Sequence, residues 1–512
     1  MNIDGIEIKG ITCDSRKVKE GYAFVALKGE KTNGHFYIND AIQKGASVIY
    51  TECNIDYVES DKVIFKKVDN ARMVLSQLCH EFYGFPTEKM KIIGVTGTNG
   101  KTTTTHLIYN VLRDQGVSVG LIGTLYIKIN DKTYSTNLTT PEPEEIFKYM
   151  AMMVTENVEV VVMEVSSHAL ESYRVHAIEF DVAVHTNIDR DHLNHHKTME
   201  NYILCKKKLF DYLPSGKIAV INLDDQYGLK LLDNNQKIVV ITYGLNPRST
   251  ITASSLDVDF NVAFTYCLQR GLTTLSGLEI EPFEYPISTN LLGKHNMYNS
   301  LAAITCCLLL DIHIEKIAVS FKNALGILRR MEIIYNNDLL IIDDFSHNPS
   351  SYETVFSTIQ NMQYKNVHII NAIRGNRGVD INRENAEVIS NWAGVLGVKN
   401  LIITSSKDCV SPKDYVLKEE LDEFLDVFNK NNLVYEYSDK LYDAIDKVLN
   451  NIENGDMLLL LGAQGMNMGA KYVLSVLETN GNIVFDNLKK ENEINRNKIN
   501  SCLLYTSPSP RD

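Results

Sequence analysis

IIGVTGTNGKTT, at residues 92–103, joins a short apolar strand to a glycine-containing turn and the start of a helix. Glycines let backbone N–H groups turn toward phosphate oxygens, and the N-terminus of a helix adds partial positive charge. Lys101 supplies a full charge, and the Thr102 hydroxyl is placed to ligate Mg²⁺. The residues predicted to bind the phosphates of ATP are Gly97, Thr98, Asn99, Gly100, Lys101, Thr102 and Thr103.

The match to the general phosphate-loop pattern is incomplete. That pattern has glycine five residues before Gly100, where this chain has Val95, with Gly94 beside it. The alternative is a glycine turn before a helix that happens to contain lysine. The strand–turn–helix setting favours nucleotide binding, since Leu107, Ile108, Val111 and Leu112 recur at helical spacing after the turn.

A chain of 512 residues exceeds what one hydrophobic core usually supports, so we expect several domains. Residues 158–165 have the apolar, β-branched character of a parallel strand covered on both faces. Strand–helix alternation predicts an α/β fold of three domains, with a central phosphate-loop ATPase sheet and a C-terminal Rossmann-like domain. Residues 251–285 are predicted to form a β-rich insertion. The predicted segments are an N-terminal domain at 1–88, a central ATP-binding domain at 89–329, a C-terminal amino-acid-binding domain at 330–480, a tail at 481–500 and, at 501–512, a scar that resembles a translated sequencing-library adapter.

Composition favours a cytoplasmic enzyme. The formal net charge of −13 argues against a general nucleic-acid binder. Nine cysteines without a CxxC pair suit a reducing compartment rather than a disulfide framework or a zinc ribbon. No apolar run reaches the ~18 residues of a membrane span, and the first ten residues carry charges where a signal peptide needs an apolar stretch.

The segment from Val95 to Thr103 is similar to the variant phosphate loop of the Mur ligases, and the resemblance continues in the same order across nearly the whole chain. Among those ligases the chain is most similar to the members that add the third residue of the peptidoglycan stem peptide. The resemblance implies an ATP- and Mg²⁺-dependent amide ligase that works through an acyl phosphate. The implied substrates are a UDP-muramoyl-dipeptide and a small amino acid. The implied process is cell-wall biogenesis, and hence cell shape and division. We expect the ligase to be a monomer.

Several short segments resemble the family's substrate contacts. Thr12–Arg16 and Gly34-His35 resemble a uridine-nucleotide domain, although a polar turn would also explain Asp14-Ser15-Arg16. A Thr-Pro pair at 140–141 resembles a muramoyl-peptide contact and is also an ordinary helix start. The residues that the resemblance implies for substrate binding are Ser15, His35, Thr139, Thr140, Ser167, Arg174 and Arg377.

A metal site is implied beside the phosphates. Glu164 and His168 lie just past a predicted buried strand, where α/β sheets place ligand-binding residues. By resemblance both are metal-site groups, together with Thr102 and a carbamylated Lys206; the neighbouring Lys207 and Lys208 leave that register open by one. The resemblance makes Lys101, Glu164, Lys206 and His168 the catalytic set.

Three histidines, His192, His195 and His196, would also suit zinc. With no cysteine partner and a hard-cation site implied nearby, we expect instead that Asn187 and His192 shape the nucleotide pocket. Asn296 and Asn299, one helical turn apart, resemble the family's adenine-side amides. Arg330 resembles a hinge arginine, and Asp344 and His347 resemble ribose and phosphate contacts; a helix cap is the alternative for Asp344.

The third domain departs from the family pattern. Arg377 remains in Gly375–Gly378, but the acid that usually follows it does not. Ser406-Lys407-Asp408-Cys409 stands where the family has a diaminopimelate-binding Asp-Asn-Pro-Arg, and cysteine cannot bind a carboxylate bidentately as arginine does. Residues 462–467 also differ, so the amine is left open: diaminopimelate, lysine or another. Two further alternatives are a folylpolyglutamate-type ligase and a non-catalytic nucleotide-binding paralogue.

Overall fold

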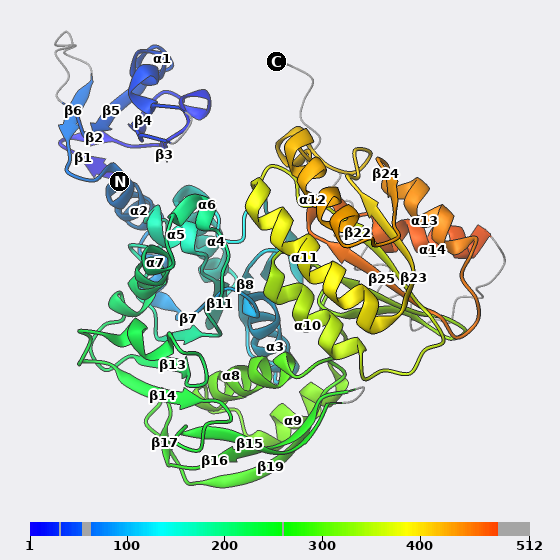
Figure 1. The fold of residues 1–512 in the computed structure, drawn as a ribbon. Coiled ribbons are helices and arrows are strands. Elements are labelled where there is room, and N and C mark those ends of the chain that lie inside the picture. The colour runs from blue at the N-terminus through cyan, green and yellow to red at the C-terminus, as the bar shows by residue number, and fades with distance from the viewer. Residues whose placement is uncertain (30–31, 54–62, 259–260, 480–512) are drawn as a thin grey trace.

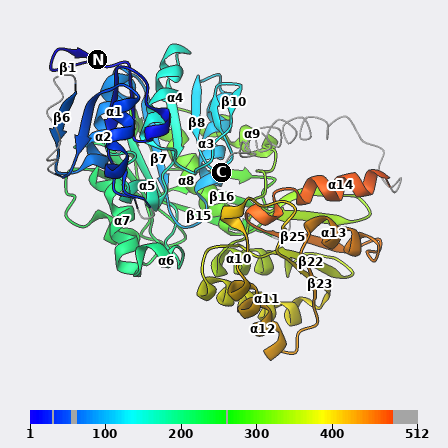
Figure 2. The same ribbon diagram turned by 90° about the horizontal axis from the view of Figure 1, so that it is seen from above.

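The computed structural model describes residues 1–29, 32–53, 63–258 and 261–479, so the predicted tail and scar lie outside the described residues. Three larger sheets follow one another along the chain, and each lies within one of the three predicted domain ranges. Figures 1 and 2 show the sheet of β3 (Gly10–Thr12) to β6 (Ile64–Lys67) and the C-terminal sheet on opposite sides of the central one. The central sheet therefore stands between the other two.

The N-terminal sheet has four parallel strands in the order β3-β4-β5-β6. Its core is apolar on both faces of the strands, with Val25 and Val48 on one side and Phe24 and Ile49 on the other. The elements of this part of the chain are β3 (Gly10–Thr12), β4 (Tyr22–Val25), α1 (Ile38–Gln43), β5 (Ala46–Thr51), β6 (Ile64–Lys67) and α2 (Ala71–Phe82). Before them, β1 (Asn2–Ile3) and β2 (Ile6–Glu7) pair with each other in a separate two-stranded sheet.

The central sheet has eleven strands in the order β10-β9-β8-β11-β7-β12-β13-β14-β15-β16-β19. Strands β8, β11, β7, β12, β13 and β14 are mutually parallel, as buried strands joined by helical crossovers must be. The strands of its first part are β7 (Lys91–Thr96), β8 (Val119–Ile122), β9 (Ile127–Ile129), β10 (Lys132–Tyr134), β11 (Val160–Glu164), β12 (Val182–His185), β13 (Ile218–Asn222) and β14 (Val239–Tyr243).

Helices cover both faces of this sheet because successive side chains of a strand point to opposite sides. In β11, Val161 and Met163 join one core cluster, while Val160 and Val162 join the other. The first cluster includes buried side chains of α2, α4, α5 and α7, and the second those of α3 and α8. The helices are α3 (Lys101–Asp114), α4 (Pro143–Thr155), α5 (Ser167–Glu171), α6 (Leu193–His196), α7 (Met199–Asp211), α8 (His295–Leu309) and α9 (Ile314–Asn323).

Three strands of the predicted β-rich insertion extend the central sheet, and the other two pair with each other in a two-stranded sheet. Ile251 of β15 pairs with Tyr243 of β14, and β16 and β19 then add antiparallel strands at the same edge. The sequence showed the strands but not their long-range pairing. They are β15 (Ile251–Asp257), β16 (Ala263–Leu268), β17 (Leu272–Thr273), β18 (Glu279–Ile280) and β19 (Phe283–Ser288).

The C-terminal sheet has the order β20-β21-β25-β22-β23-β24, and all its pairs are parallel except β20 with β21. One face packs on α10, α11 and α12, and the other on α13 and α14, which is the doubly wound arrangement expected from the sequence. Its elements are β20 (Glu332–Asn336), β21 (Leu340–Asp344), α10 (Pro349–Ile359), β22 (Val367–Ala372), α11 (Val379–Leu396), β23 (Val398–Thr404), α12 (Lys418–Lys430), β24 (Glu436–Ser438), α13 (Leu441–Leu449), β25 (Met457–Gly462) and α14 (Gly469–Thr479).

No helix in the described part of the chain combines the length and the apolar character that crossing a bilayer requires.

Candidate active site

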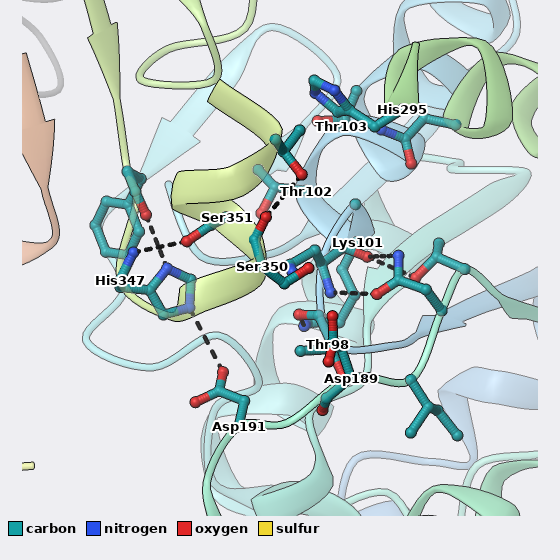
Figure 3. Close-up of a pocket in the computed structure, with 18 of the residues that line it drawn as sticks. Thr98, Lys101, Thr102, Thr103, Asp189, Asp191, His295, His347, Ser350 and Ser351 are labelled. Atoms are coloured by element: carbon teal, nitrogen blue, oxygen red, sulfur yellow. Dashed lines mark hydrogen bonds and ion pairs between the residues drawn. The ribbon is translucent and has the colours of Figure 1, made fainter. Parts of the chain in front are cut away.

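A pocket of about 530 Å³ lies at the carboxyl ends of the central parallel strands, where the C-terminal domain meets the phosphate loop. Ligands bind at this edge of open α/β sheets. Figure 3 shows α3 and α10 side chains facing each other across it. The predicted site residues that line it are Thr98, Asn99, Gly100, Lys101, Thr102, Thr103, Thr139, Glu164, Ser167, Asn187, His192, Lys206, Asn299, Arg330, Asp344 and His347.

The loop needs glycine at two positions. Gly100 has φ +86°, a left-handed conformation, and a Cβ there would lie 2.3 Å from Asn299 Oδ1. At Gly97 a Cβ would lie 1.9 Å from Thr186 Oγ1. Helix α3 then begins at Lys101, and because the cap residue Gly100 has no side chain, the first backbone N–H groups of the helix have no side-chain cap.

Cationic side chains converge on this helix terminus. Lys101 Nζ donates to the carbonyl oxygens of Gly97 and Thr98, both at 2.8 Å. Burial lowers the pKa of Lys101, Glu164 and Asp191 oppose that shift, and repulsion by Arg330 adds to it. Burial likewise lowers the pKa of Arg330, while Asp344 and Glu164 oppose that shift. An anion in the pocket would offset this accumulation of buried positive charge.

Glu164 ends β11 and is fully buried. Its Oε2 accepts hydrogen bonds from the hydroxyls of Thr102 (2.9 Å) and Thr124 (3.1 Å), and its Oε1 accepts from the Thr124 backbone N–H (2.7 Å). A carboxylate and a threonine hydroxyl beside a helix N-terminus are hard oxygen donors of the kind Mg²⁺ prefers. These two side chains therefore fit the predicted magnesium site.

Lys206 is buried on α7, and its Nζ donates to the carbonyl oxygen of Gly97 at 2.8 Å. The two neighbouring lysines lie elsewhere: Lys207 pairs with Asp211, and Lys208 lies over the Tyr173 ring at 4.4 Å. Of the three, Lys206 alone lines the pocket. Burial, and then repulsion by Lys101, lowers its pKa well below the usual lysine value, which favours the neutral amine.

Side chains of the C-terminal domain and of the segment before it reach the phosphate loop. Arg330 Nη2 donates to Thr102 Oγ1 at 3.1 Å, and Asn348 Nδ2 donates to Asn99 Oδ1 at 3.3 Å. His347 Nε2 lies 3.6 Å from Asp191 Oδ2, a contact drawn in Figure 3. The two domains are thus in contact around the pocket.

Eight predicted site residues do not line the pocket. Asn296 lies beneath it, where its Oδ1 accepts from Asn299 Nδ2 at 2.8 Å. The Thr140 hydroxyl donates to the Glu164 carbonyl oxygen at 2.8 Å, and its own carbonyl oxygen accepts from Arg174. His168 packs against other histidines. The remaining members are Gly97, whose carbonyl oxygen accepts from both lysines, and Ser15, His35 and Arg377, which lie in the N- and C-terminal domains.

Arg374, Asp191 and Gln464 are among the pocket residues that the sequence assignments missed. Arg374 follows β22, and burial lowers its pKa. Asp191 is buried, and its pKa lies well below the usual range because His192, His347 and Arg374 outweigh desolvation. Gln464 follows β25. Arg374 and Gln464 lie two residues after β22 and β25, and Asp191 lies in the segment that follows β12. These positions were a usable signal, since ligand-binding residues gather at the carboxyl ends of parallel strands.

Asp344 uses both carboxylate oxygens within its own domain. Its Oδ2 accepts from the Met331 N–H at 2.8 Å, and its Oδ1 accepts from the Ser346 hydroxyl at 2.5 Å. Burial raises its pKa, whereas Ser346 and Arg330 lower it. Asp344 thus lines the pocket and also fixes the turn that precedes α10.

The loop at 406–409 supports neighbouring helices. Asp408 accepts from the backbone N–H groups of Leu441 and Tyr442 at the start of α13. Cys409 Sγ lies 3.7 Å from the Tyr472 hydroxyl on α14. None of the four residues is part of the pocket lining described above.

Three family models match the chain in succession: a Mur ligase catalytic domain at residues 7–83, a Mur ligase middle domain at 95–307, and a Mur ligase glutamate ligase domain at 329–464. The chain is also 34% identical over 465 residues to a UDP-N-acetylmuramoyl-L-alanyl-D-glutamate–2,6-diaminopimelate ligase of Aquifex aeolicus. That match covers 89% of this chain and 88% of the relative.

Two solved structures share the fold. One is a UDP-N-acetylmuramoyl-L-alanyl-D-glutamate–2,6-diaminopimelate ligase, with a TM-score of 0.63 and 21% identity, covering 93% of this chain and 95% of that one. The other is a Mycobacterium tuberculosis folylpolyglutamate synthase complexed with ADP and AMPPCP, with a TM-score of 0.62 and 15% identity. It covers 78% of this chain and 95% of that one.

Proposed function

The chain belongs to the Mur ligase family, and from this premise we propose that it joins an amino acid to UDP-N-acetylmuramoyl-L-alanyl-D-glutamate with ATP as the energy source. The reaction adds the third residue of the peptidoglycan stem peptide. The curated relatives that it matches over most of its length carry this reaction in their names. We further propose that the ligase acts in the cytoplasm as a monomer.

One observation carries the ATP assignment. The uncapped N-terminus of α3 and the side chains of Lys101 and Arg330 meet at one end of the pocket. Helix N-termini and converging cations bind phosphate groups. We propose that the ATP phosphates lie there and replace the carbonyl oxygens of Gly97 and Thr98 as partners of the Lys101 ammonium.

The first chemical step is attack of the substrate carboxylate on the γ-phosphorus of ATP. A carboxylate oxygen forms the new P–O bond, the bond to the β–γ bridging oxygen breaks, and ADP leaves. Lys101 and Arg330 neutralise the charge that spreads over the phosphoryl oxygens. The amine then attacks the acyl phosphate carbon, inorganic phosphate leaves, and the amine loses a proton to complete the amide. Contact between the two domains around the pocket holds the reacting groups together and excludes water.

We propose that Thr102 and Glu164 hold Mg²⁺ and that Lys206, once carbamylated, adds a carboxylate beside them. The ion would supply charge neutralisation at the phosphates. A lysine with a depressed pKa presents the neutral amine that reacts with CO₂, and Lys206 has this property. The predicted place of His168 in this set has less support, because its ring packs on His195 outside the pocket lining.

The identity of the amine rests on the C-terminal domain. The names of the relatives favour 2,6-diaminopimelate. The loop at 406–409, however, has no arginine, and its Asp408 and Cys409 contact α13 and α14. Arg374 follows β22 and Gln464 follows β25, and both line the pocket. We propose that they face the amino acid.

One incubation tests this function. The full chain is mixed with ATP, Mg²⁺, the UDP-muramoyl-dipeptide and a panel of amino acids that includes diaminopimelate and lysine, and product mass is recorded. A mass increase equal to one amino acid less water supports the proposal. Phosphate release without a new mass, or no turnover with any amine, would refute it.

A folylpolyglutamate-type activity is the second candidate because a folylpolyglutamate synthase shares the fold. That likeness covers 78% of this chain, and the N-terminal region at 7–83 matches a Mur ligase model. A dihydrofolate arm with glutamate in the same assay separates the two activities. A non-catalytic paralogue would give no product in any arm.

A further inference from the structure

A second group of metal-ligand side chains lies beside the pocket, at the C-terminal ends of α5 and α6. Glu171 is the last residue of α5, and His195 and His196 end α6. One ligand atom from each of the three lies within 4.8 Å of the others. This group shares no residue with the proposed Mg²⁺ site at Thr102 and Glu164.

The ring nitrogens of both histidines face one carboxylate. His195 Nε2 contacts Glu171 Oε2, and His196 Nδ1 lies 3.6 Å from the same oxygen. His196 Nε2 lies 2.9 Å from the Ser167 hydroxyl oxygen. In the tautomer that donates this Nε2–H to Ser167, the lone pair of Nδ1 points at the carboxylate. A hydrogen bond of this kind behind a histidine ligand is what orients metal-binding imidazoles.

Packing holds both rings in place while leaving one side open. The His195 ring stacks on His168 with centroids 4.2 Å apart, and the His196 ring lies 5.2 Å from that of Tyr202. The His196 side chain is 1% exposed, whereas that of His195 is 23% exposed and that of Glu171 45% exposed. The group therefore has a buried wall and a face that an ion can reach from solvent.

We propose that Glu171, His195 and His196 bind a divalent transition-metal ion of the Zn²⁺ or Co²⁺ type. Two imidazoles and one carboxylate suit these borderline ions, whereas Mg²⁺ prefers an all-oxygen shell. Three protein ligands leave further positions for water. The sequence argued against zinc because the histidines have no cysteine partner and a hard-cation site is implied nearby. The structure supplies a different third ligand, Glu171, from a separate helix and in contact with His195 although 24 residues away in sequence.

Such an ion would join two walls of the pocket. Helix α5 starts with Ser167, and α6 directly follows His192; both of these residues line the pocket. With the ion bound, metal–ligand bonds from Glu171, His195 and His196 would hold α5 and α6 at a fixed separation, in addition to the contact between His196 and Ser167. Occupancy therefore restricts motion of the segment around Asp191 and His192.

The test is metal binding by the full chain, freed of metal by a chelator and kept in excess Mg²⁺. Titration with Co²⁺ is followed by its visible d–d absorption, and Zn²⁺ is then added as competitor. We expect one Co²⁺ per chain, displaced by Zn²⁺. Even loss of a residue behind a metal ligand lowers affinity by roughly 10- to 100-fold, so Glu171→Gln and His195→Asn should each weaken binding by at least about tenfold.

His313→Gln is the matched control, because His313 is an exposed imidazole before α9 that makes no capping hydrogen bond. It should bind Co²⁺ like the parent chain. Circular dichroism and the urea midpoint of each variant establish whether it is folded. If Glu171→Gln is not folded, the Co²⁺ affinity of His195→Asn alone tests the proposal. Absence of a Co²⁺ spectrum in the parent chain, or equal affinity in the parent and both site variants, would overturn the proposal.

Discussion

Replacing Lys101 by methionine separates the role of its charge from its role in packing. Methionine is unbranched and similar in reach, so it fills the same space without the ammonium. In the ligand-free chain the variant loses two hydrogen bonds to Gly97 and Thr98, worth about 1 kcal/mol each. It also no longer buries a charge whose pKa is depressed. We expect the two effects to offset each other, leaving the unfolding free energy within about 2 kcal/mol of the parent.

The nucleotide-bound state should respond very differently. Two unit charges about 4 Å apart interact by ~4 kcal/mol at an effective dielectric constant near 20, which is roughly a thousandfold in Kd. At an ATP concentration 100 times the parent Kd, binding stabilises the parent by about 2.7 kcal/mol. The same concentration would stabilise a variant that binds a thousandfold more weakly by only ~0.1 kcal/mol.

Urea unfolding with and without Mg-ATP measures both numbers, and isothermal titration gives the Kd directly. Lys230→Met is the matched control, since Lys230 lies in the 3₁₀ segment Gly228–Leu232 and is no part of the pocket lining. Its stabilisation by ATP should equal that of the parent. An ATP-induced stabilisation of Lys101→Met that also equals the parent's would refute the placement of phosphates at the α3 terminus.

Three further outcomes are expected. Incubation with ¹³CO₂ should give one carbamate carbon signal by NMR in the parent chain and none in Lys206→Arg. The reason is that the lowered pKa of Lys206 favours the neutral amine, which is the form that reacts with CO₂. The same signal in both chains would contradict the assignment. Glu164→Gln should lose activity and about 2–4 kcal/mol of stability in urea unfolding, because the carboxylate accepts three hydrogen bonds in a buried site; an unchanged urea midpoint would contradict this. Burial lowers the pKa of His106 from 6.5 to about 3. Below pH 6.5 the unfolded chain therefore takes up a proton that the folded chain does not, and the free energy of unfolding decreases as the pH is lowered. His106→Gln should reduce the change of unfolding free energy with pH by up to ~1.4 kcal/mol per pH unit, as measured by urea unfolding at several acid pH values. An equal pH dependence in the parent and the variant would contradict this reasoning.

The nucleotide end of the site follows from local sequence. Strand β7, the glycine loop and α3 fall where residues 92–112 predicted them, since a glycine with positive φ and a strand–turn–helix register are properties of neighbouring residues. The general phosphate-loop pattern has glycine where this chain has Val95, and the structure gives a physical reason for valine. Val95 is buried within β7 and pairs with Glu164 and Val184. That position belongs to the sheet core.

The opposite end of the site depends on contacts between distant segments, which the sequence pattern does not contain. Arg374 and Asp191 face each other only because the C-terminal domain packs against the central one. Asp408 stands where the family has its diaminopimelate-binding motif, and the structure shows that it accepts hydrogen bonds from the first backbone N–H groups of α13. The strands at 251–288 were recognised as strands, but their pairing with β14 was not predictable from a local pattern.

The most direct test of carboxyl activation follows an oxygen atom. The UDP-muramoyl-dipeptide is prepared with ¹⁸O in its terminal carboxylate and turned over with ATP and the accepted amine. Transfer through an acyl phosphate predicts one ¹⁸O in each inorganic phosphate released, detected by mass spectrometry or by the ³¹P isotope shift. Product formed together with unlabelled phosphate would contradict phosphorylation of the carboxyl group in this pocket.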